Sequence, residues 1–297
     1  MALDYEKLMT WQEPEIIQRY SIQDTILYGL SLGYGSNPVD ENDLSFVYER
    51  QLKALPSMAT ILASPWGWLY HAKVGINPTL AVHGFQGIHL YKILPVATEV
   101  GSILKVKGIE DKGPNRGAIV WFERNLYETK SGDLLATIEA SMFCRGDGGY
   151  GGEKHEHEHG PRQIKEHPTR PPDFIRQYTT LPQLALIFRL HGDLNPIHAD
   201  PLVALKAGFN RPILHGLCTY GMATKAILET CCDSNPIRLK SISTFFSAPV
   251  FPGDAIDFRI WLNHNSVYFE AVVSLRDAIV LKGGSAELAL HFHPLEQ

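Results

Sequence analysis

Residues 189–221 read RLHGDLNPIHADPLVALKAGFNRPILHGLCTYG, and the rest of the chain is arranged around them. They contain an acid, Asp193, and a histidine, His198, five positions apart. Partners on one helix face sit three or four residues apart, so a shared helix does not bring this pair together. Asn195 and Pro196 lie between them, and proline disfavours the helical region for the residue before it. A turn here predicts that Asp193 and His198 fold over one small space.

The second half of the chain places a long apolar helix before a series of strands. Residues 214–231 are apolar nearly all round, which is expected of a helix wrapped by a sheet. Before this helix, residues 173–179 are predicted to be extended and residues 181–190 helical. After it, four runs have the pattern of strands: Lys240–Ala248, Asp254–Leu262, Val267–Leu275 and Ile279–Phe292.

The first half shows the same order of elements. Residues 24–32 predict a short helix, and residues 56–69 predict a first central helix with Ser57 as its N-cap. Four runs with the pattern of strands follow: Leu80–Tyr91, Gly101–Glu110, Gly117–Tyr127 and Leu134–Cys144. A helix followed by strands in each half predicts an α+β fold with antiparallel sheets and segregated helices.

The two halves also align with each other. A shift of 158 residues lays residues 20–44 on residues 178–202 and matches the Asn-Pro pair of each half. At the positions of the reactive acid and histidine, the first half has Gly35 and Asp40 instead. We therefore predict one active site per chain, in the second half.

A glycine-rich and then charged, proline-rich segment separates the halves. This composition excludes a regular element and predicts a connection. The expected division is a first half at 1–150, a linker at 151–172 and a catalytic half at 173–297. The linker contains His155, His157 and His159, and imidazoles are metal ligands. Nothing else in the segment fixes a coordination geometry, so we predict a solvated linker and no metal.

Composition limits the class of protein and its partners. The chain has 297 residues, and such a length suggests two domains of about 150 residues each. The net charge of −5 argues against nucleic acid as a partner. Four cysteines without a disulfide or metal spacing predict free thiols. No signal peptide or apolar run of membrane-spanning length is apparent, so no membrane partner is expected. The last residues, LEQ, lack the Ser-Lys-Leu type of peroxisomal address, so the expected location is cytoplasmic.

The motif DLNPIHAD followed by AGFNRPILHGLCTYG resembles the MaoC-like (R)-specific enoyl-CoA hydratases, or hydratase 2. The resemblance extends through YER, LYKILP, GDGGYGG, RPPD and SAPVFPGD. It implies a double hotdog fold, in which each sheet wraps around one central helix. It also implies reversible hydration of trans-2-enoyl-CoA to (R)-3-hydroxyacyl-CoA, with no metal or redox cofactor. Hotdog proteins commonly pair sheets edge to edge, which implies a homodimer.

Hydration next to a thioester needs two proton transfers and stabilisation of negative charge on the thioester oxygen. An acid and a histidine that share one water can supply both transfers. Backbone N–H groups at a helix start can receive the oxygen. In the family, the positions of Asp193 and His198 form the acid–base pair, Asn195 lies beside them, and the Gly216 N–H binds the oxygen.

Other residues have weaker predicted roles. Phosphates of coenzyme A favour Arg or Lys at a pocket mouth, and the candidates are Arg211, Arg170 and Lys206. The expected roles of His191 and His215 are structural. The first half, free of a reactive pair, is expected to hold the acyl tail. Trp66, Trp68 and Phe85 are candidates for the wall of its pocket, with core packing as the alternative, and His83 either packs in a strand or lines the pocket.

Two other functions remain open on the sequence alone. A thioesterase can use the same fold and a carboxylate, but it does not need the Asp-x-Asn-Pro-x-His arrangement. A non-catalytic acyl-CoA-binding protein can keep the pocket, but it has no use for Asp193, Asn195 and His198 together.

Overall fold

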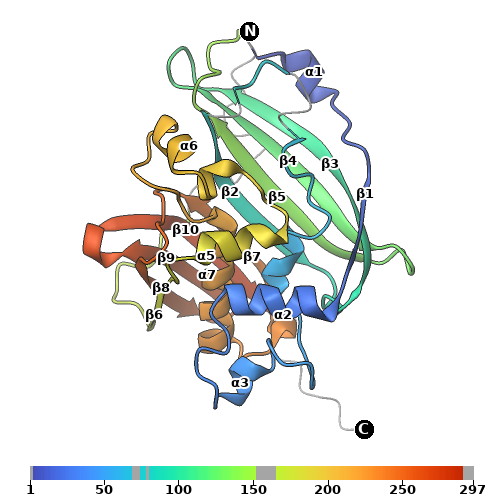
Figure 1. Ribbon diagram of the computed structural model, residues 1–297, viewed down its shortest axis with the longest axis vertical. Helices are drawn as coiled ribbons and strands as arrows, with labels where there is room; N and C mark the ends of the chain where they lie inside the picture. Colours follow the sequence, from blue (N-terminus) through green and yellow to red (C-terminus); the bar gives the residue numbers. More distant parts are fainter. Residues whose placement is uncertain (1–2, 69–73, 78–79, 152–164, 290–297) are drawn as a thin grey trace.

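The computed structural model describes residues 3–68, 74–77, 80–151 and 165–289. Ten strands form one antiparallel sheet in the order β1-β3-β4-β5-β2-β7-β10-β9-β8-β6 (Figure 1). β2 and β7 join the two halves of this sheet, with paired residues running from Phe85–Phe245 to His89–Ser241. The halves therefore share one continuous sheet.

Each half contributes five consecutive strands along the sheet. The strands of the first half are β1 (Ile16–Tyr20), β2 (Ala81–Leu90), β3 (Thr98–Asp111), β4 (Ala118–Glu128) and β5 (Leu134–Cys144). Those of the second half are β6 (Phe174–Thr179), β7 (Leu239–Phe246), β8 (Ala255–Asn263), β9 (Ser266–Val273) and β10 (Ala278–Leu288). The eight strands predicted to follow the central helices are all present, as is the extended segment before the second helix. Edge strand β1 is an addition to the sequence prediction.

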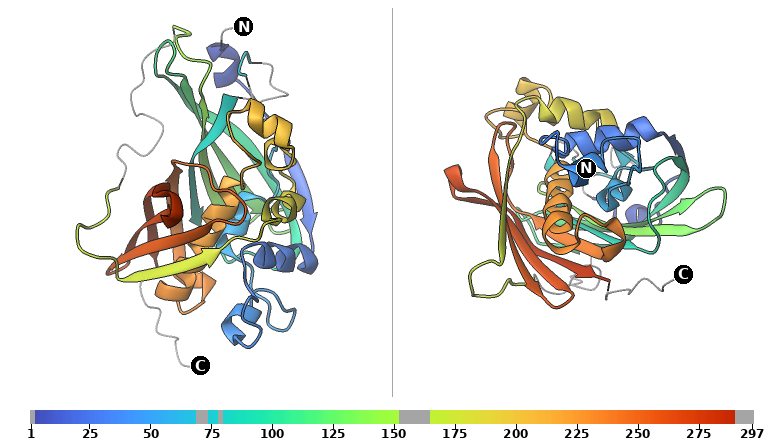
Figure 2. Two further views of the ribbon diagram at one scale, coloured as in Figure 1. Left: turned by 60° about the vertical axis from the view of Figure 1, so that its left-hand side comes forward. Right: turned by 90° about the horizontal axis from the view of Figure 1, so that it is seen from below.

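The second central helix is α7 (Gly216–Cys231), and its predicted position is confirmed. Nearly every side chain of α7 is buried, including three small residues that allow close approach, at positions 218, 221 and 223. The curved sheet wraps around α7 (Figure 2). This arrangement confirms the predicted α+β double hotdog.

The first central helix is much shorter than residues 56–69, so that prediction is wrong. Only η1 (Pro56–Thr60), a 3₁₀-helix, is formed there. Ser57 is not the N-cap, because Leu55 occupies the cap and Ser57 is fully buried. The guanidinium of Arg124, which reaches in from β4, accounts for the early end. It donates to the carbonyls of residues 59, 60 and 62, which a longer helix would need for its own N–H groups.

The other α-helices of the described chain are short. They are α1 (Tyr5–Met9), α2 (Ile22–Ser31), α3 (Glu41–Leu44), α5 (Leu184–Phe188) and α6 (Pro201–Lys206). The predictions of helix at 24–32 and 181–190 are confirmed by α2 and α5, which contact each other. A capping box between Ser21 and Asp24 fixes the start of α2. Within the described parts of the chain, no helix has the length and apolarity to span a membrane.

A buried charge network holds the two halves together around α7. Lys225 of α7 is 2% exposed and donates to the Gly33 carbonyl of the first half at 2.8 Å. Its ammonium also lies 3.9 Å from Asp43 and 3.7 Å from Glu229. Glu229 in turn accepts a hydrogen bond from Tyr178 of β6 at 2.6 Å. Loss of one partner would leave a buried charge uncompensated, which costs about 3–5 kcal/mol. The network therefore fixes the first half against the central helix of the second.

Candidate active site

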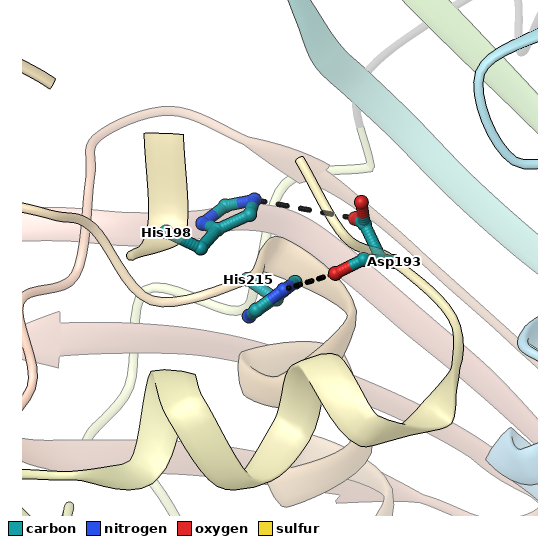
Figure 3. A group of neighbouring side chains, drawn as sticks. All are labelled: Asp193, His198 and His215. Atoms are coloured by element: carbon teal, nitrogen blue, oxygen red, sulfur yellow. Dashed lines mark hydrogen bonds and ion pairs between the residues drawn. The ribbon is translucent and has the colours of Figure 1, made fainter. Parts of the chain in front are cut away.

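A tight turn brings Asp193 and His198 together, as the sequence predicts. Gly192 ends the helical turn after α5 with a φ of +112°, and this conformation favours glycine. A second short helix, η4 (Pro196–His198), follows at once, and the Asn195 side chain caps it by accepting from the Ile197 N–H at 3.1 Å. The Asp193 carboxylate then lies 4.0 Å from His198 Nε2 (Figure 3). This separation is too long for a hydrogen bond and fits one shared water.

The protonation state of His198 follows from its contacts. Its Nδ1 lies 2.8 Å from the Ile213 carbonyl. A carbonyl only accepts, so Nδ1 carries the hydrogen. Nε2 therefore has a free lone pair, and it faces Asp193. Burial lowers the pKa of His198, although the Asp193 charge and the Ile213 carbonyl oppose the shift. His198 is thus neutral near pH 7 and ready to accept a proton.

His215 lies directly beneath this pair, which the sequence did not predict. Its ring stacks on that of His198 with centroids 3.7 Å apart (Figure 3). Its Nε2 lies 3.2 Å from the Asp193 backbone carbonyl and so carries the hydrogen. Burial is the larger cause and the positive charge of protonated His198 the smaller one, and together they lower the pKa of His215 to about 2. His215 is therefore a neutral ring at any working pH.

Gly216, the residue after His215, is the first residue of α7. Among the described residues, no acceptor bonds to its backbone N–H, which is one of the free donors at any helix start. A side chain at this position would crowd Phe246, whose ring lies 3.0 Å from the place of a Cβ. The N-terminus of α7 thus offers a backbone donor, with the helix dipole behind it, next to the acid and the histidine.

Comparison with known proteins places this geometry in a family. A MaoC like domain matches residues 163–282, and the MFE-2 hydratase 2 N-terminal domain matches residues 18–146. The Arabidopsis thaliana protein named peroxisomal enoyl-CoA hydratase 2 is 35% identical over 293 residues, or 93% of each chain. The chain belongs to the MaoC-like family. The resemblance noted in residues 189–221 is confirmed.

Two further comparisons agree with this membership. The Mycobacterium tuberculosis protein named 3-hydroxyacyl-thioester dehydratase Y is 37% identical over 267 residues, which cover 88% of each chain. The crystal structure of a MaoC-like dehydratase from Phytophthora capsici superposes with a TM-score of 0.83 at 30% identity. It covers 97% of this chain and 99% of that one. The similarity therefore includes both halves of this MaoC-like protein.

The three cationic residues predicted for phosphate binding do not lie together. Arg211 is largely exposed and packs over the Phe251 ring, 3.9 Å from the Asp254 carboxylate. Phe251 follows Val250, whose carbonyl accepts from Leu214 just before α7. This contact places Arg211 beside the start of that helix. Lys206, also exposed, ends α6.

Arg170 lies at the other end of β8 from Arg211. It forms a bidentate pair with Asp173 at 2.6 and 2.8 Å and donates to the Leu262 carbonyl. Leu262 is eight positions of extended chain beyond Asp254, a span of roughly 25 Å. The structure thus does not bring Arg170 close to Arg211. A cation that the sequence did not indicate, Arg276, does lie there and shares Asp254 and the Phe251 ring with Arg211.

One tryptophan of the first half of this MaoC-like protein reaches the reactive turn, which is formed by residues 192–198. The Trp66 indole Nε1 would lie 2.7 Å from a Cβ on Gly192, next to Asp193. Trp68 packs against Phe122 in a separate apolar cluster. Within the described chain, Trp66 thus contacts the turn and Trp68 does not. Its approach depends on how the halves pack, which residue spacing does not reveal.

Two other predicted wall residues have different surroundings. Phe85 packs on Trp121 of its own half and on Phe245 of the second half. His83 packs against Phe246, the ring next to Gly216, and burial lowers the pKa of His83 to about 4. Its Nε2 is buried and has no partner among the described residues. Of the two, His83 lies nearer to the reactive turn.

Asp193, His198 and His215 are close enough to suggest a metal site, since ligand atoms of all three lie within 4.8 Å of one another. The hydrogen bonds argue against one. His215 uses Nε2 to hold a carbonyl and His198 uses Nδ1 to hold another, so a metal bound through either atom would break an existing bond. The buried Nδ1 of His215 has no partner in the described chain, but it lies on another edge of the ring from the Nε2 that meets Asp193. A protein zinc site needs three or four ligands. The linker histidines, at positions 155, 157 and 159, lie outside the described residues.

A cavity of about 240 Å³ opens at the far end of β2 from His83. Its wall is apolar apart from two lysines and a tyrosine: Ala54, Pro56, Leu90, Tyr91, Lys92, Ile93, Leu94, Pro236, Ile237, Leu239 and Lys240. It contains neither a carboxylate nor a histidine. This cavity therefore offers no pair of groups for acid–base chemistry.

Proposed function

We propose that this chain is a hydro-lyase that reversibly hydrates trans-2-enoyl-CoA to (R)-3-hydroxyacyl-CoA in fatty-acyl or related acyl-CoA metabolism. The observation that carries the proposal is the 4.0 Å approach of the Asp193 carboxylate to the free lone pair of His198, beside the Gly216 N–H, which has no acceptor in the described chain. The (R) stereochemistry follows from family membership. Relatives named for hydration and for dehydration support a reaction that runs in both directions.

The pair supplies the proton transfers. A water held between Asp193 and His198 attacks C3 of the enoyl group, and its O–H bond breaks as the new C3–O bond forms. His198 Nε2 takes the released proton and then delivers it to C2 on the same face, so that Asp193 and His198 return to their starting protonation states. Asn195 positions the turn, since its side-chain oxygen caps η4 and its backbone N–H donates to Asp193 at 3.2 Å. The product gains one hydrogen and one hydroxyl, so the atoms of water balance.

The oxygen of the thioester carries the negative charge between these steps. The Gly216 N–H is the proposed donor, aided by the positive end of the α7 dipole. A preorganised donor of this kind contributes about 10²–10³ in rate. The proposed mechanism uses no metal or redox cofactor, and coenzyme A takes part only as a portion of the substrate.

In the first half, the positions that match Asp193 and His198 form local backbone hydrogen bonds, which supports a single active site. The Gly35 N–H donates to Asp43 at 2.9 Å, and Asp40 caps α3. We therefore keep the proposed division into a non-catalytic half at 1–150, a linker at 151–172 and a catalytic half at 173–297. In this proposal the first half holds the acyl tail, which enters past Trp66.

The nucleotide part of coenzyme A is proposed to lie near Arg211 and Lys206, with Arg276 as a third cation. Arg211 and Arg276 flank one aromatic ring at 4.9 and 5.1 Å beside the start of α7. Guanidinium groups match phosphate geometry. A homodimer, which the resemblance to hotdog proteins implies, and a cytoplasmic location complete the proposal.

The decisive test is the reaction of crotonyl-CoA, followed by enone absorbance and by a thiol reagent in parallel. Hydration removes the absorbance and releases no thiol. Thiol release at the rate of absorbance loss would instead identify a thioesterase. Binding without any change in absorbance would identify a non-catalytic acyl-CoA-binding protein. Chiral analysis of the 3-hydroxybutyryl product tests the (R) assignment.

A further inference from the structure

His215 contacts both members of the reactive pair, yet substrate cannot reach it. The side chain is 1% exposed. Its Nε2–H donates to the Asp193 backbone carbonyl at 3.2 Å, and its ring stacks on His198 at an interplanar angle of 24°. Phe188 of α5 packs against another side of the ring, with centroids 5.1 Å apart. The imidazole is therefore enclosed between the turn and α5.

The hydrogen bonds around His215 run in both directions between two segments. From the reactive turn, His198 donates to the carbonyl of Ile213 at 2.8 Å. From the segment before α7, His215 donates back to Asp193, and the Ile213 N–H donates to Ile197 at 3.4 Å. These bonds clamp residues 193–198 to residues 213–216. The clamp ends at the proposed oxyanion donor, since the residue after His215 is Gly216.

The charge state of His215 suits this role. Its ring centroid lies 3.7 Å from that of His198. A second imidazolium at this distance would repel the proton that His198 receives during the reaction. The surroundings of His215 exclude this charge, since burial lowers its pKa to about 2. The neutral His215 ring can thus stack on His198 whether His198 is neutral or protonated, and it does not repel the protonated form.

We propose that His215 is a positioning residue, which holds the acid, the histidine and the Gly216 N–H in one geometry through the Asp193 hydrogen bond and the stacked ring. The inference rests on the proposed catalytic roles of Asp193 and His198. Partners that orient reactive groups in this way are commonly worth about 10–100-fold in activity. The effect should appear in kcat, because His215 does not touch the substrate.

The test uses His215→Phe, which keeps the stacked ring and removes the donor, and His215→Gln, which places an amide N–H at about the position of Nε2. With crotonyl-CoA, we expect His215→Phe to lower kcat roughly 10–100-fold with KM within about threefold, and His215→Gln to recover part of the loss. Thr219→Val is the matched control. Thr219 is buried one turn along α7, and its hydroxyl has no partner in the described chain, so kcat should be unchanged.

A double-mutant cycle separates positioning from general damage to the fold. In the His198→Gln background the group that His215 positions is already lost, so adding His215→Phe should lower kcat less than about threefold. An equal loss in both backgrounds, or unchanged kcat in His215→Phe, would overturn the proposal. If His215→Phe does not fold, His215→Leu, which also lacks the donor, takes its place in the cycle. Absence of hydration by the wild-type protein would instead overturn the proposed function itself.

Discussion

Gly192 offers a sharp test of how the first half supports the reactive turn. Its φ of +112° lies in the left-handed region, and a Cβ would come within 2.7 Å of Trp66 Nε1 and 3.1 Å of Cδ1. Gly192→Ala therefore adds both backbone strain and crowding. Gly208, just after α6, has a φ of +90° and open space around the position of a Cβ. Gly208→Ala is the matched control, because it adds the strain alone.

The two contributions can be separated in magnitude. A left-handed conformation costs a non-glycine residue about 1–2 kcal/mol, which applies to both variants. Overpacking costs about 1–3 kcal/mol more and applies only to Gly192→Ala. Asp193 is the next residue, and a displacement of about 1 Å in a reactive group costs on the order of 10²-fold in rate. Gly192→Ala should thus lose more stability than Gly208→Ala and, unlike it, lose kcat.

Urea unfolding and crotonyl-CoA turnover measure these effects side by side. Adding Trp66→Leu to Gly192→Ala removes the indole nitrogen and should recover the crowding part of the stability loss. The reasoning fails if the two glycine variants lose equal stability and both keep wild-type kcat. It also fails if Trp66→Leu gives no recovery, since the indole would then not be what limits position 192.

Three further predictions address the other half, the cations and acid stability. Asp40→Asn should leave kcat within a few-fold, because Asn caps a helix as well as Asp does and Gly35 offers no partner acid; a loss as large as that of His198→Gln would reveal a second site. Arg211→Ala should raise KM for enoyl-CoA roughly 3–10-fold and leave KM for an enoyl-pantetheine thioester unchanged, since that substrate lacks the nucleotide phosphates; equal effects on both would exclude a phosphate contact. Burial lowers the pKa of His83 to about 4. The free energy of unfolding is therefore unaffected by protonation of His83 above the pKa of about 6.5 that the residue has in the unfolded chain. As the pH drops from there toward the pKa in the folded protein, the free energy of unfolding falls by up to about 1.4 kcal/mol per pH unit. Urea unfolding at pH 7 and pH 5 should show a smaller acid loss in His83→Phe than in wild type, by roughly 1–2 kcal/mol, and an identical loss would contradict the burial argument.

Local patterns were enough to predict most of the fold. The strands of both halves have alternating apolar residues or β-branched runs, and α7 is apolar on all sides, so each element carries its own signal. The approach of Asp193 to His198 also follows from local chemistry, because Pro196 forces a turn between them. These features depend on residues that are close in sequence.

Contacts between distant residues account for what the sequence did not reveal. The first central helix ends at Thr60 because Arg124, from β4, takes its carbonyls. Arg170 is the right residue type for a phosphate contact, but it is held at the far end of β8, where it donates to the carbonyl of Leu262, 92 positions away. The closeness of Trp66 to Gly192 depends on how the two halves pack. None of these partners can be chosen from spacing alone.

The central claim is that Asp193 and His198 act together on one water to hydrate the enoyl thioester. It is tested most directly by kcat for crotonyl-CoA hydration in Asp193→Asn, His198→Gln and the double variant. Each single variant should lose roughly 10²–10⁴ in kcat with smaller changes in KM, and the double variant should lose much less than the product of the two. Turnover near the wild-type rate in either single variant would contradict the assignment.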